Sequence, residues 1–168
     1  NLVYPAYRTI YGKEVAAGTI EGCTVGIPGW VNVENGIAAA AAALIGGIEP
    51  EKVKDALAAF QGVERRFDIH LNTPQIAYID DYAHHPNEIS SAISSIRNIF
   101  PGRKLTAVFQ PHLYTRTRDF AKEFAQSLSL VDELVLLDIY PARELPIEGV
   151  TSQIIFDDVT VGKKVLLK

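Results

Sequence analysis

The densest group of polar side chains in the sequence is the segment Asp80–Pro86, which reads DDYAHHP. It follows a short apolar run and precedes a helix-like pattern, so the free backbone amides at the start of that helix would face a ligand. This position suits a phosphate or a carboxylate, and an aspartate there can accept hydrogen bonds from sugar hydroxyls. The same residues are equally consistent with a polar turn in which Asp81 and His84 cap the helix.

A second polar segment, Gln110–Arg118, reads QPHLYTRTR and follows another apolar run. It gathers imidazole, phenol and guanidinium groups in one loop. Arg116 could bind a carboxylate or a phosphate through two parallel hydrogen bonds. The alternative is a solvated loop in which Thr117 caps a helix that starts at Arg118.

Two weaker signals lie upstream of these segments. Arg65 and Arg66 occupy a connector, where an arginine can reach a phosphate bound between domains, although such a pair is usually solvated. Asn32 is a natural N-cap for the alanine-rich stretch that follows it. Asn35 would then lie in the first helical turn, where asparagine is not a favoured residue, and its amide could contact a ligand base or amide.

The pattern from Val63 onward alternates strands and helices, which favours an α/β domain with a parallel sheet. The expected strands are 67–71, 75–80, 105–109, 133–139, 154–156 and 163–167, and the expected helices are 86–99 and 117–130. Ligands of such sheets bind at the carboxyl ends of the strands. The rule predicts a site built from residues 80–86, 110–118 and 138–144, which are also the segments richest in His, Arg, Asp and Tyr.

The first sixty residues have a different character. Short strands and turns precede an alanine-rich helix at 33–45, which Gly46-Gly47 ends. A second helix begins near Pro50, because proline and acidic residues are favoured in a first turn. We expect Trp30 to lie in the core. We place the domain boundary near Gln61-Gly62, which divides the chain into residues 1–61 and 62–168.

Composition excludes several classes of protein. The 168 residues carry 16 Lys and Arg against 20 Asp and Glu, a net charge of −4, which argues against a general nucleic-acid binder. The single cysteine, Cys23, permits no internal disulfide. There is no zinc-ligand spacing, no GxSxG elbow and no GxxxxGK[ST] phosphate loop. The absence of methionine leads us to expect a piece of a longer chain.

Three motifs in order resemble the carboxyl-terminal domain of the Mur ligases: DDYAHHPNEI, FQPHLYTRTRDF and LLDIYPARELPIEGV. Upstream, PGWVNVENGIAAAAAAL resembles the end of that family's central ATP-binding domain, and GVERRFD resembles its junction. The resemblance covers roughly residues 27–150. It implies a Rossmann-like, mostly parallel sheet with flanking helices over 62–168, ending before the family's last strand and helix. Residues 1–61 would be the tail of the ATP-binding domain.

The resemblance also implies an activity. The family member most similar in these motifs joins L-alanine to the lactyl carboxylate of UDP-N-acetylmuramate in the bacterial cytoplasm. ATP phosphorylates the carboxylate, Mg²⁺ shields the phosphate charge, and the amine attacks the acyl phosphate. The phosphate loop and the UDP-binding domain of the family are absent from these 168 residues, so we expect this piece alone to be inactive and to need the rest of its chain.

Matching the motifs residue by residue implies a set of site residues. The residues that would bind ATP are Asn32, Asn35, Arg66, Asp81 and Tyr82. Those that would line the reaction centre as catalytic residues are His84 and His85. Those that would hold the amino acid or the muramoyl end are His112, Tyr114 and Arg116. No residue of this chain is expected to be a metal ligand.

Three other readings stay open at this stage. One is a recycling ligase that attaches a murein tripeptide to UDP-N-acetylmuramate, which has a similar HHP loop. Another is a non-catalytic module that binds a nucleotide or an amino acid. A metal-dependent hydrolase built on His84, His85 and His112 is disfavoured, because adjacent histidines point in different directions and metal-ligand spacing is lacking.

Overall fold

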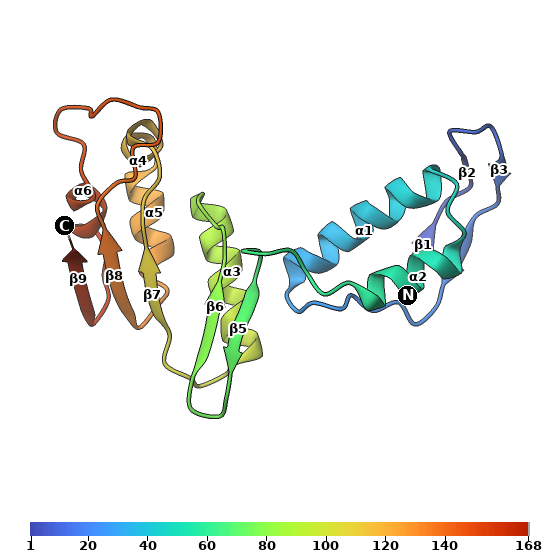
Figure 1. Cartoon of the computed structure of the whole chain (residues 1–168), viewed down its shortest axis with the longest axis horizontal. Coiled ribbons are helices and arrows are strands. Elements are labelled where there is room, and N and C mark those ends of the chain that lie inside the picture. Colours follow the sequence, from blue (N-terminus) through green and yellow to red (C-terminus); the bar gives the residue numbers. More distant parts are fainter. Residues whose placement is uncertain (168) are drawn as a thin grey trace. The chain divides into compact units, whose positions relative to one another are not determined.

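The computed structural model describes residues 1–167 and divides the chain into two compact units, Asn1–Asp80 and Asp81–Lys168 (Figure 1). Each unit is described separately below. No helix within residues 1–167 combines the length and the apolar character that crossing a bilayer requires.

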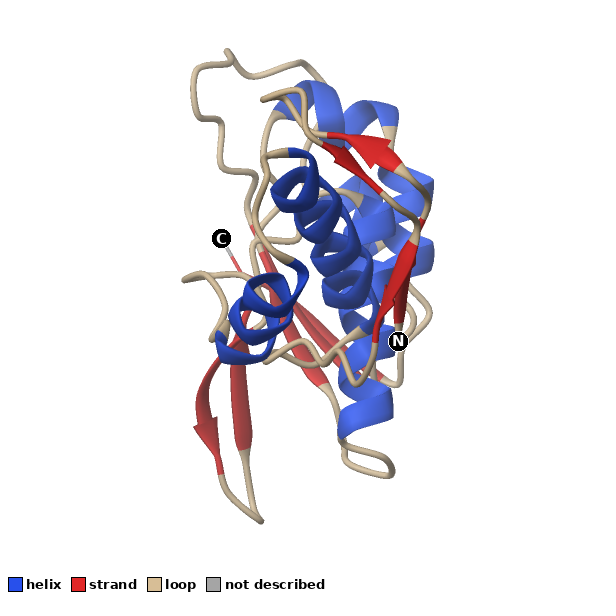
Figure 2. Ribbon diagram, turned by 90° about the vertical axis from the view of Figure 1, so that its right-hand side faces the viewer, coloured by secondary structure: helices blue, strands red, loops and turns tan. Residues whose placement is uncertain are grey.

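Four short strands open unit 1 and pair as two antiparallel ladders. They are β1 (Leu2–Tyr4) with β4 (Gly18–Ile20), and β2 (Tyr7–Arg8) with β3 (Glu14–Val15). Figure 2, in which strands are red and helices blue, shows how short the strands beside the N-terminus are compared with the helices. The expected strands and turns of this region are therefore present.

Helix α1 (Trp30–Ile45) begins earlier than the sequence pattern suggested, and Asn32 is not its N-cap. Gly29 takes that position with φ of 103°, which glycine adopts without steric cost, and its carbonyl accepts hydrogen bonds from the amides of Asn32 and Val33. The alanine run then sustains the helix, because alanine has the highest helix propensity. Trp30 is 72% exposed, so the prediction that it lies in the core was wrong.

Helix α2 (Pro50–Ala59) has proline in its first turn, as expected, and packs against α1. The core between the two helices consists of Ala40 and Leu44 of α1 and Val53 of α2. Tyr4 and Tyr7 pack against this core from the strands. The packing of α1 against α2 therefore rests on a small apolar core, in which the short side chain of Ala40 allows the two helices to approach closely.

The last part of unit 1 is a hairpin of β5 (Asp68–Asn72) and β6 (Ala77–Asp80), which pair antiparallel. We expected 75–80 to be a buried strand of the parallel sheet. Instead Tyr78 is 57% exposed and Ile76 is 56% exposed. Asn72, Thr73 and Pro74 turn the chain back on itself, so β6 pairs with β5. The apolar run at 75–80 predicted a strand but not its pairing partner.

Unit 2 contains the predicted parallel sheet. Its strands are β7 (Thr106–Phe109), β8 (Glu133–Leu137) and β9 (Lys163–Leu167), in the order β7-β8-β9. The register aligns Phe109 with Leu136. The Rossmann-like arrangement of parallel strands with flanking helices is confirmed.

The helices of unit 2 follow the prediction with two exceptions. Helix α3 (Pro86–Ile99) has the predicted bounds. The single helix expected at 117–130 is two helices, α4 (Tyr114–Asp119) and α5 (Ala121–Leu128), because Phe120 leaves the helical conformation at φ −123° and ψ 22°. The strand expected at 154–156 is instead a short helix, α6 (Gln153–Phe156).

The core of unit 2 joins one face of β8 to the helices. Leu134 and Leu136 of β8 are 1% and 0% exposed, and Phe124 and Leu128 of α5 are each 1% exposed. Alternate residues of a strand point to the same face, so β8 presents both leucines to the helices. This core fixes where α5 lies, and with it the loop that precedes the helix.

We predict that Leu136→Ala lowers the free energy of unfolding by about 2–5 kcal/mol, because it leaves a cavity at a site with no exposed surface. Leu145→Ala is the matched control: Leu145 is 84% exposed, so its truncation should change stability by no more than about 0.5 kcal/mol. Urea unfolding of the two variants measures the difference. Equal effects would mean that β8 is not the centre of the core.

Candidate functional site

The loops that follow β7 and β8 are joined by backbone hydrogen bonds beyond the ends of the strands. The amide of Leu113 donates to the carbonyl of Tyr140 at 3.0 Å, and the amide of Tyr140 donates to the carbonyl of Pro111 at 2.8 Å. His112 and Tyr140 form a parallel bridge and stack with ring centroids 5.5 Å apart. Two of the three segments predicted from the strand order, 110–118 and 138–144, therefore lie side by side, as Figure 1 also shows.

Helix α4 starts from an unusual backbone conformation. Leu113, its N-cap, has φ of 75°, a left-handed conformation that costs free energy in a residue other than glycine. Thr117 is fully buried, and its hydroxyl donates to the Leu113 carbonyl at 2.8 Å. Thr117 is therefore inside the helix and does not cap one that starts at Arg118. The left-handed residue turns the chain so that Tyr114, Thr115 and Arg116 form the first turn.

A carboxylate anchors this first turn. Glu144 accepts hydrogen bonds from the backbone amide of Thr115 at 3.0 Å and from its hydroxyl at 2.5 Å. These hydrogen bonds, and to a lesser degree the positive charge of Arg116, lower the pKa of Glu144 from its ordinary value. The carboxylate is thus ionised at neutral pH. Sequence reasoning placed the segment 138–144 at the site but did not single out this residue.

Arg116 is the most distinctive side chain of the site. It is partly buried, and its Nη1 atom is fully buried with no hydrogen-bond partner among the residues that the structure describes. A buried donor without an acceptor is costly and is rare in folded proteins. Such a guanidinium is suited to binding an anionic ligand that supplies the missing acceptor, and a carboxylate matches its geometry.

The loop before α3 is shaped by its own side chains. Asp81 accepts a hydrogen bond from the amide of Ala83 at 2.8 Å, which forms a local turn. Glu88 accepts from the amides of His84 and His85, at 3.0 and 3.2 Å. His85 is the N-cap of α3, so neither Asp81 nor His84 caps the helix, and sequence reasoning missed the role of Glu88.

The same loop contacts the end of α4 through an aromatic pair. The ring of His85 lies edge-on to Phe120, with centroids 4.8 Å apart, at the break between α4 and α5. His84 contacts Tyr82 in the same way, at 5.0 Å, and its Nδ1 lies 2.9 Å from the carbonyl oxygen of Tyr82. The start of α3 and the loops after β7 and β8 thus gather at one edge of unit 2 (Figure 1).

Unit 1 carries a separate group of predicted residues. An open groove of about 730 Å³ is lined by Asn32, Asn35 and Arg66, together with small and apolar side chains from α1 and α2. Asn32 is buried and its amide donates to the carbonyl of Pro28, so part of its hydrogen-bonding capacity is used within the protein. Asn35 is exposed, and its amide can bind a ligand directly.

Arg66 is presented by a tight turn between α2 and β5. Its amide donates to the carbonyl of Val63 at 3.0 Å, and the residues on either side, Arg65 and Phe67, have φ of 62° and 52°. Arg65 pairs with Asp80 at 3.7 Å, which ties the turn to β6. The adjacent arginines therefore have different surroundings, and it is Arg66 that lines the groove.

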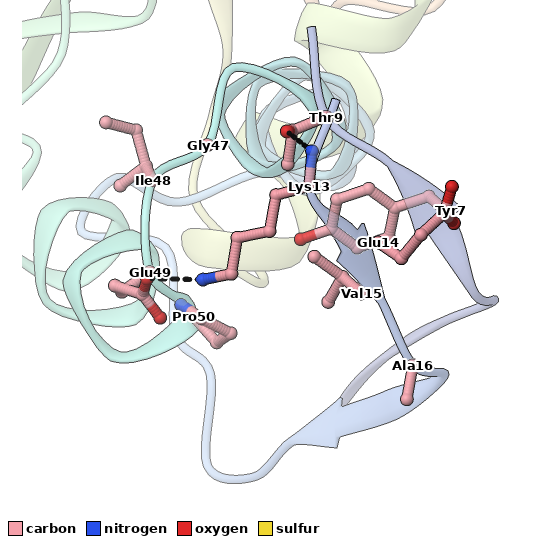
Figure 3. A pocket seen from close by; sticks show the side chains of 10 residues that line it. All are labelled: Tyr7, Thr9, Lys13, Glu14, Val15, Ala16, Gly47, Ile48, Glu49 and Pro50. Atoms are coloured by element: carbon pink, nitrogen blue, oxygen red, sulfur yellow. Dashed lines mark hydrogen bonds and ion pairs between the residues drawn. The ribbon is translucent and has the colours of Figure 1, made fainter. Parts of the chain in front are cut away.

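A smaller cavity of about 230 Å³ lies beside β2 and β3 and contains none of the predicted site residues. Figure 3 shows Lys13 reaching across it to Glu49, and the Nζ–Oε1 distance is 3.3 Å. The backbone amide of Lys13 donates to the hydroxyl of Thr9. Lys13 and Glu49 thus bind each other, and Glu14 pairs with Arg8 at 3.4 Å, so this cavity is the weaker candidate for a ligand site.

Comparison with known proteins agrees with the geometry. Residues 65–167, more than half of the chain, match the family model described as "Mur ligase, glutamate ligase domain". The chain is similar to the UDP-N-acetylmuramate–L-alanine ligase of Parabacteroides distasonis, with 57% identity over 94% of this chain and 33% of that protein. The corresponding ligase of Porphyromonas gingivalis (strain W83) is 50% identical over 95% of this chain and 35% of that protein.

The chain is also similar to solved structures of ligases. The UDP-N-acetylmuramate–alanine ligase of Thermotoga maritima superposes with a TM-score of 0.67 at 30% identity, over 86% of this chain and 31% of that chain. A murein peptide ligase from Psychrobacter arcticus, with a TM-score of 0.61 at 24% identity over 87% of this chain and 30% of that chain, shares the fold. The chain spans about a third of the length of the curated relatives that it matches. From the match over 65–167 and the parallel sheet of unit 2, we conclude that the chain belongs to the Mur ligase family.

Proposed function

We propose that this chain is the carboxyl-terminal part of an ATP-dependent ligase that joins L-alanine to UDP-N-acetylmuramate in peptidoglycan precursor synthesis. The observation that carries the proposal is the 57% identity to a relative of that name, over nearly the whole chain. The partly buried Arg116, with its unpaired donor at the edge of the parallel sheet, supports it, because a guanidinium matches the carboxylate of an amino-acid substrate.

The proposed reaction proceeds in two steps. The carboxylate of the muramoyl group attacks the γ-phosphorus of ATP, which gives an acyl phosphate and releases ADP. The neutral amine of L-alanine then attacks the acyl carbon, and phosphate leaves with the electron pair of the broken C–O bond. The amine proton passes to a base, and an amide remains. The residues of this chain bind and orient the reactants, so that the second step becomes effectively unimolecular.

We assign roles to the residues of unit 2 on this basis. Arg116 binds the carboxylate of L-alanine, with His112 and Tyr114 beside it on the same loop. His84 and His85 line the reaction centre, where an imidazole can take up the amine proton. Further residues of this unit, Asp81 and Tyr82, hold the ribose side of the nucleotide.

The groove of unit 1 is also a nucleotide-binding surface in this proposal. The amides of Asn32 and Asn35 can read the edge of the adenine base, and Arg66 is charged appropriately for the phosphates. We place the boundary of the ATP-binding domain near Gln61-Gly62, which is supported by the start of the family match at residue 65. Residues 1–61 are then the end of that domain, and 62–168 the next.

Mg²⁺ is part of the proposed reaction, where it would shield the phosphate charge. Residues 1–167 contain no group of three or more His, Cys, Asp or Glu side chains that could hold a metal ion. We propose that the upstream part of the full-length protein would hold the ion. We also propose a cytoplasmic location, where ATP and the nucleotide-linked substrate would both be present.

The function is tested by phosphate release from the full-length protein, including the residues that correspond to the rest of the relatives. UDP-N-acetylmuramate and ATP are supplied with either L-alanine or murein tripeptide. We expect release that depends on L-alanine, and no release by the 168-residue chain alone. Release only with tripeptide would assign the protein to peptide recycling, and no release with either would favour a binding module.

We predict that Arg116→Ala in the full-length protein lowers kcat/KM for L-alanine on the order of 10- to 100-fold, because a charge-assisted hydrogen bond to the substrate is lost. The KM for L-alanine should rise, while the KM for ATP stays the same. Arg8→Ala, which removes an exposed arginine of β2 in unit 1, is the control and should leave both values unchanged. An equal loss in both variants would contradict the assignment.

A separate prediction concerns the groove of unit 1. Asn35→Ala should raise the KM for ATP by about 3- to 10-fold, since one or two hydrogen bonds to the base are removed, and should leave the KM for L-alanine unchanged. Asn98→Ala, an exposed asparagine on α3, is the matched control. If Asn35→Ala has no effect on ATP, the groove does not bind the adenine.

A further inference from the structure

The contact between Thr115 and Glu144 spans 29 residues of sequence and joins α4 to the loop after β8. Both donors of Thr115, its amide and its hydroxyl, go to the two oxygens of one carboxylate. The amide is one of the helix N–H groups that have no partner within the helix, and a carboxylate is the strongest acceptor available to it. Glu144 thereby fixes the position and the direction of the first turn of α4.

Arg116 is the next residue along this turn. It has no ion-pair partner within 4.0 Å in the part of the chain that the structure describes, although the charge of Arg116 is felt by Glu144. Each oxygen of Glu144 accepts a hydrogen bond from Thr115, and the described residues include no ion pair between Glu144 and Arg116 within 4.0 Å, so the carboxylate does not neutralise the guanidinium by direct contact. The arrangement keeps Arg116 near a negative charge and leaves its Nη1 donor for another acceptor.

Few other contacts could hold the first turn of α4 in place. Leu113 is in the left-handed region, which is unfavourable, so the loop needs contacts that compensate. The bond between Thr117 and the Leu113 carbonyl lies within α4 and its own N-cap. The bond between the Leu113 amide and Tyr140 holds the N-cap but not the first turn. Glu144 is the residue of the neighbouring loop that holds the first turn, mainly through the amide and hydroxyl of Thr115, with a further backbone hydrogen bond from Tyr114.

We propose that Thr115 and Glu144 are positioning residues, which hold Arg116 where it can bind the carboxylate of the amino-acid substrate. This inference rests on the proposed function. Neither residue touches the substrate in this proposal: both act through the orientation of α4. Loss of either one should release the first turn, so that Arg116 binds the substrate carboxylate less often in the correct geometry.

The test uses Thr115→Val and Glu144→Gln, alone and together, in the full-length protein. Valine keeps the shape of threonine and loses the hydroxyl, and glutamine keeps the size of glutamate and loses the charge. We expect kcat/KM for L-alanine to fall about 10-fold in each single variant, through a higher KM for L-alanine, with the KM for ATP and the melting temperature unchanged. The double variant should lose less activity than the product of the two single losses predicts, because Thr115→Val removes the hydroxyl bond that Glu144→Gln already weakens.

Two controls separate positioning from a general structural role. Thr115→Ser keeps the hydroxyl and should restore most of the kcat/KM lost in Thr115→Val. Glu148→Gln removes an exposed acid from the same loop and should have no effect. Normal kcat/KM in Thr115→Val and Glu144→Gln, or a KM for ATP that rises as much as that for L-alanine, would overturn the inference while leaving the proposed function intact.

A second measurement does not depend on turnover. Phenylglyoxal modifies accessible guanidinium groups, and mass spectrometry can follow the rate at Arg116. We expect faster modification of Arg116 in Glu144→Gln than in the wild-type protein, and an unchanged rate in Glu148→Gln. An equal rate in all three proteins would show that Glu144 does not hold Arg116, whether or not the protein is a ligase. Inactivity of the wild-type protein would overturn the proposed function separately.

Discussion

The candidate site of unit 2 depends on the parallel pairing of β7 with β8. The register that sets Phe109 opposite Leu136 brings the two carboxyl ends level, and the pairing continues past the strands as the bridge between His112 and Tyr140. If the strands were antiparallel, the two loops would leave from opposite edges of the sheet. The stacked rings, the anchored first turn of α4 and the position of Arg116 all follow from this one arrangement of the backbone.

The apolar core of unit 2 holds the paired strands and the helices in fixed positions, and thereby fixes the loops of the site. Leu134 and Leu136 hold β8 against the helices, and Phe124 does the same for α5. Buried side chains of this size each contribute roughly 1.5–3 kcal/mol, which far exceeds what an exposed polar contact supplies. The polar loops can therefore carry unfavourable features, such as left-handed Leu113, because their ends are fixed by elements whose stability does not depend on them.

The sequence was sufficient to predict the elements with strong periodicity and the edge at which they converge. Helix 86–99 has the predicted bounds, because its apolar spacing and the proline at its start agree. The break at Phe120 and the left-handed Leu113 were not predictable, because neither residue type marks an interruption. Asn32 was mistaken for an N-cap because the preference of asparagine for that position competes with glycine, and Gly29 alone accommodates φ of 103° without cost. Glu144 was missed as an individual residue, since its partner lies 29 positions away and no local pattern connects them.

A guanidinium with an unpaired buried donor is a defect if stability is the only criterion. The charge of Arg116 acts on the carboxylate of Glu144, which instead accepts hydrogen bonds from Thr115. A direct ion pair between Glu144 and Arg116 would stabilise the loop, and it would also compete with any ligand carboxylate for the same donors. Directing the carboxylate to the helix amide keeps its charge near Arg116, while the Nη1 donor remains unpaired among the described residues. The free energy lost in the unbound protein is then recovered when an anion binds, which is the general way in which a preorganised site gains selectivity for its ligand.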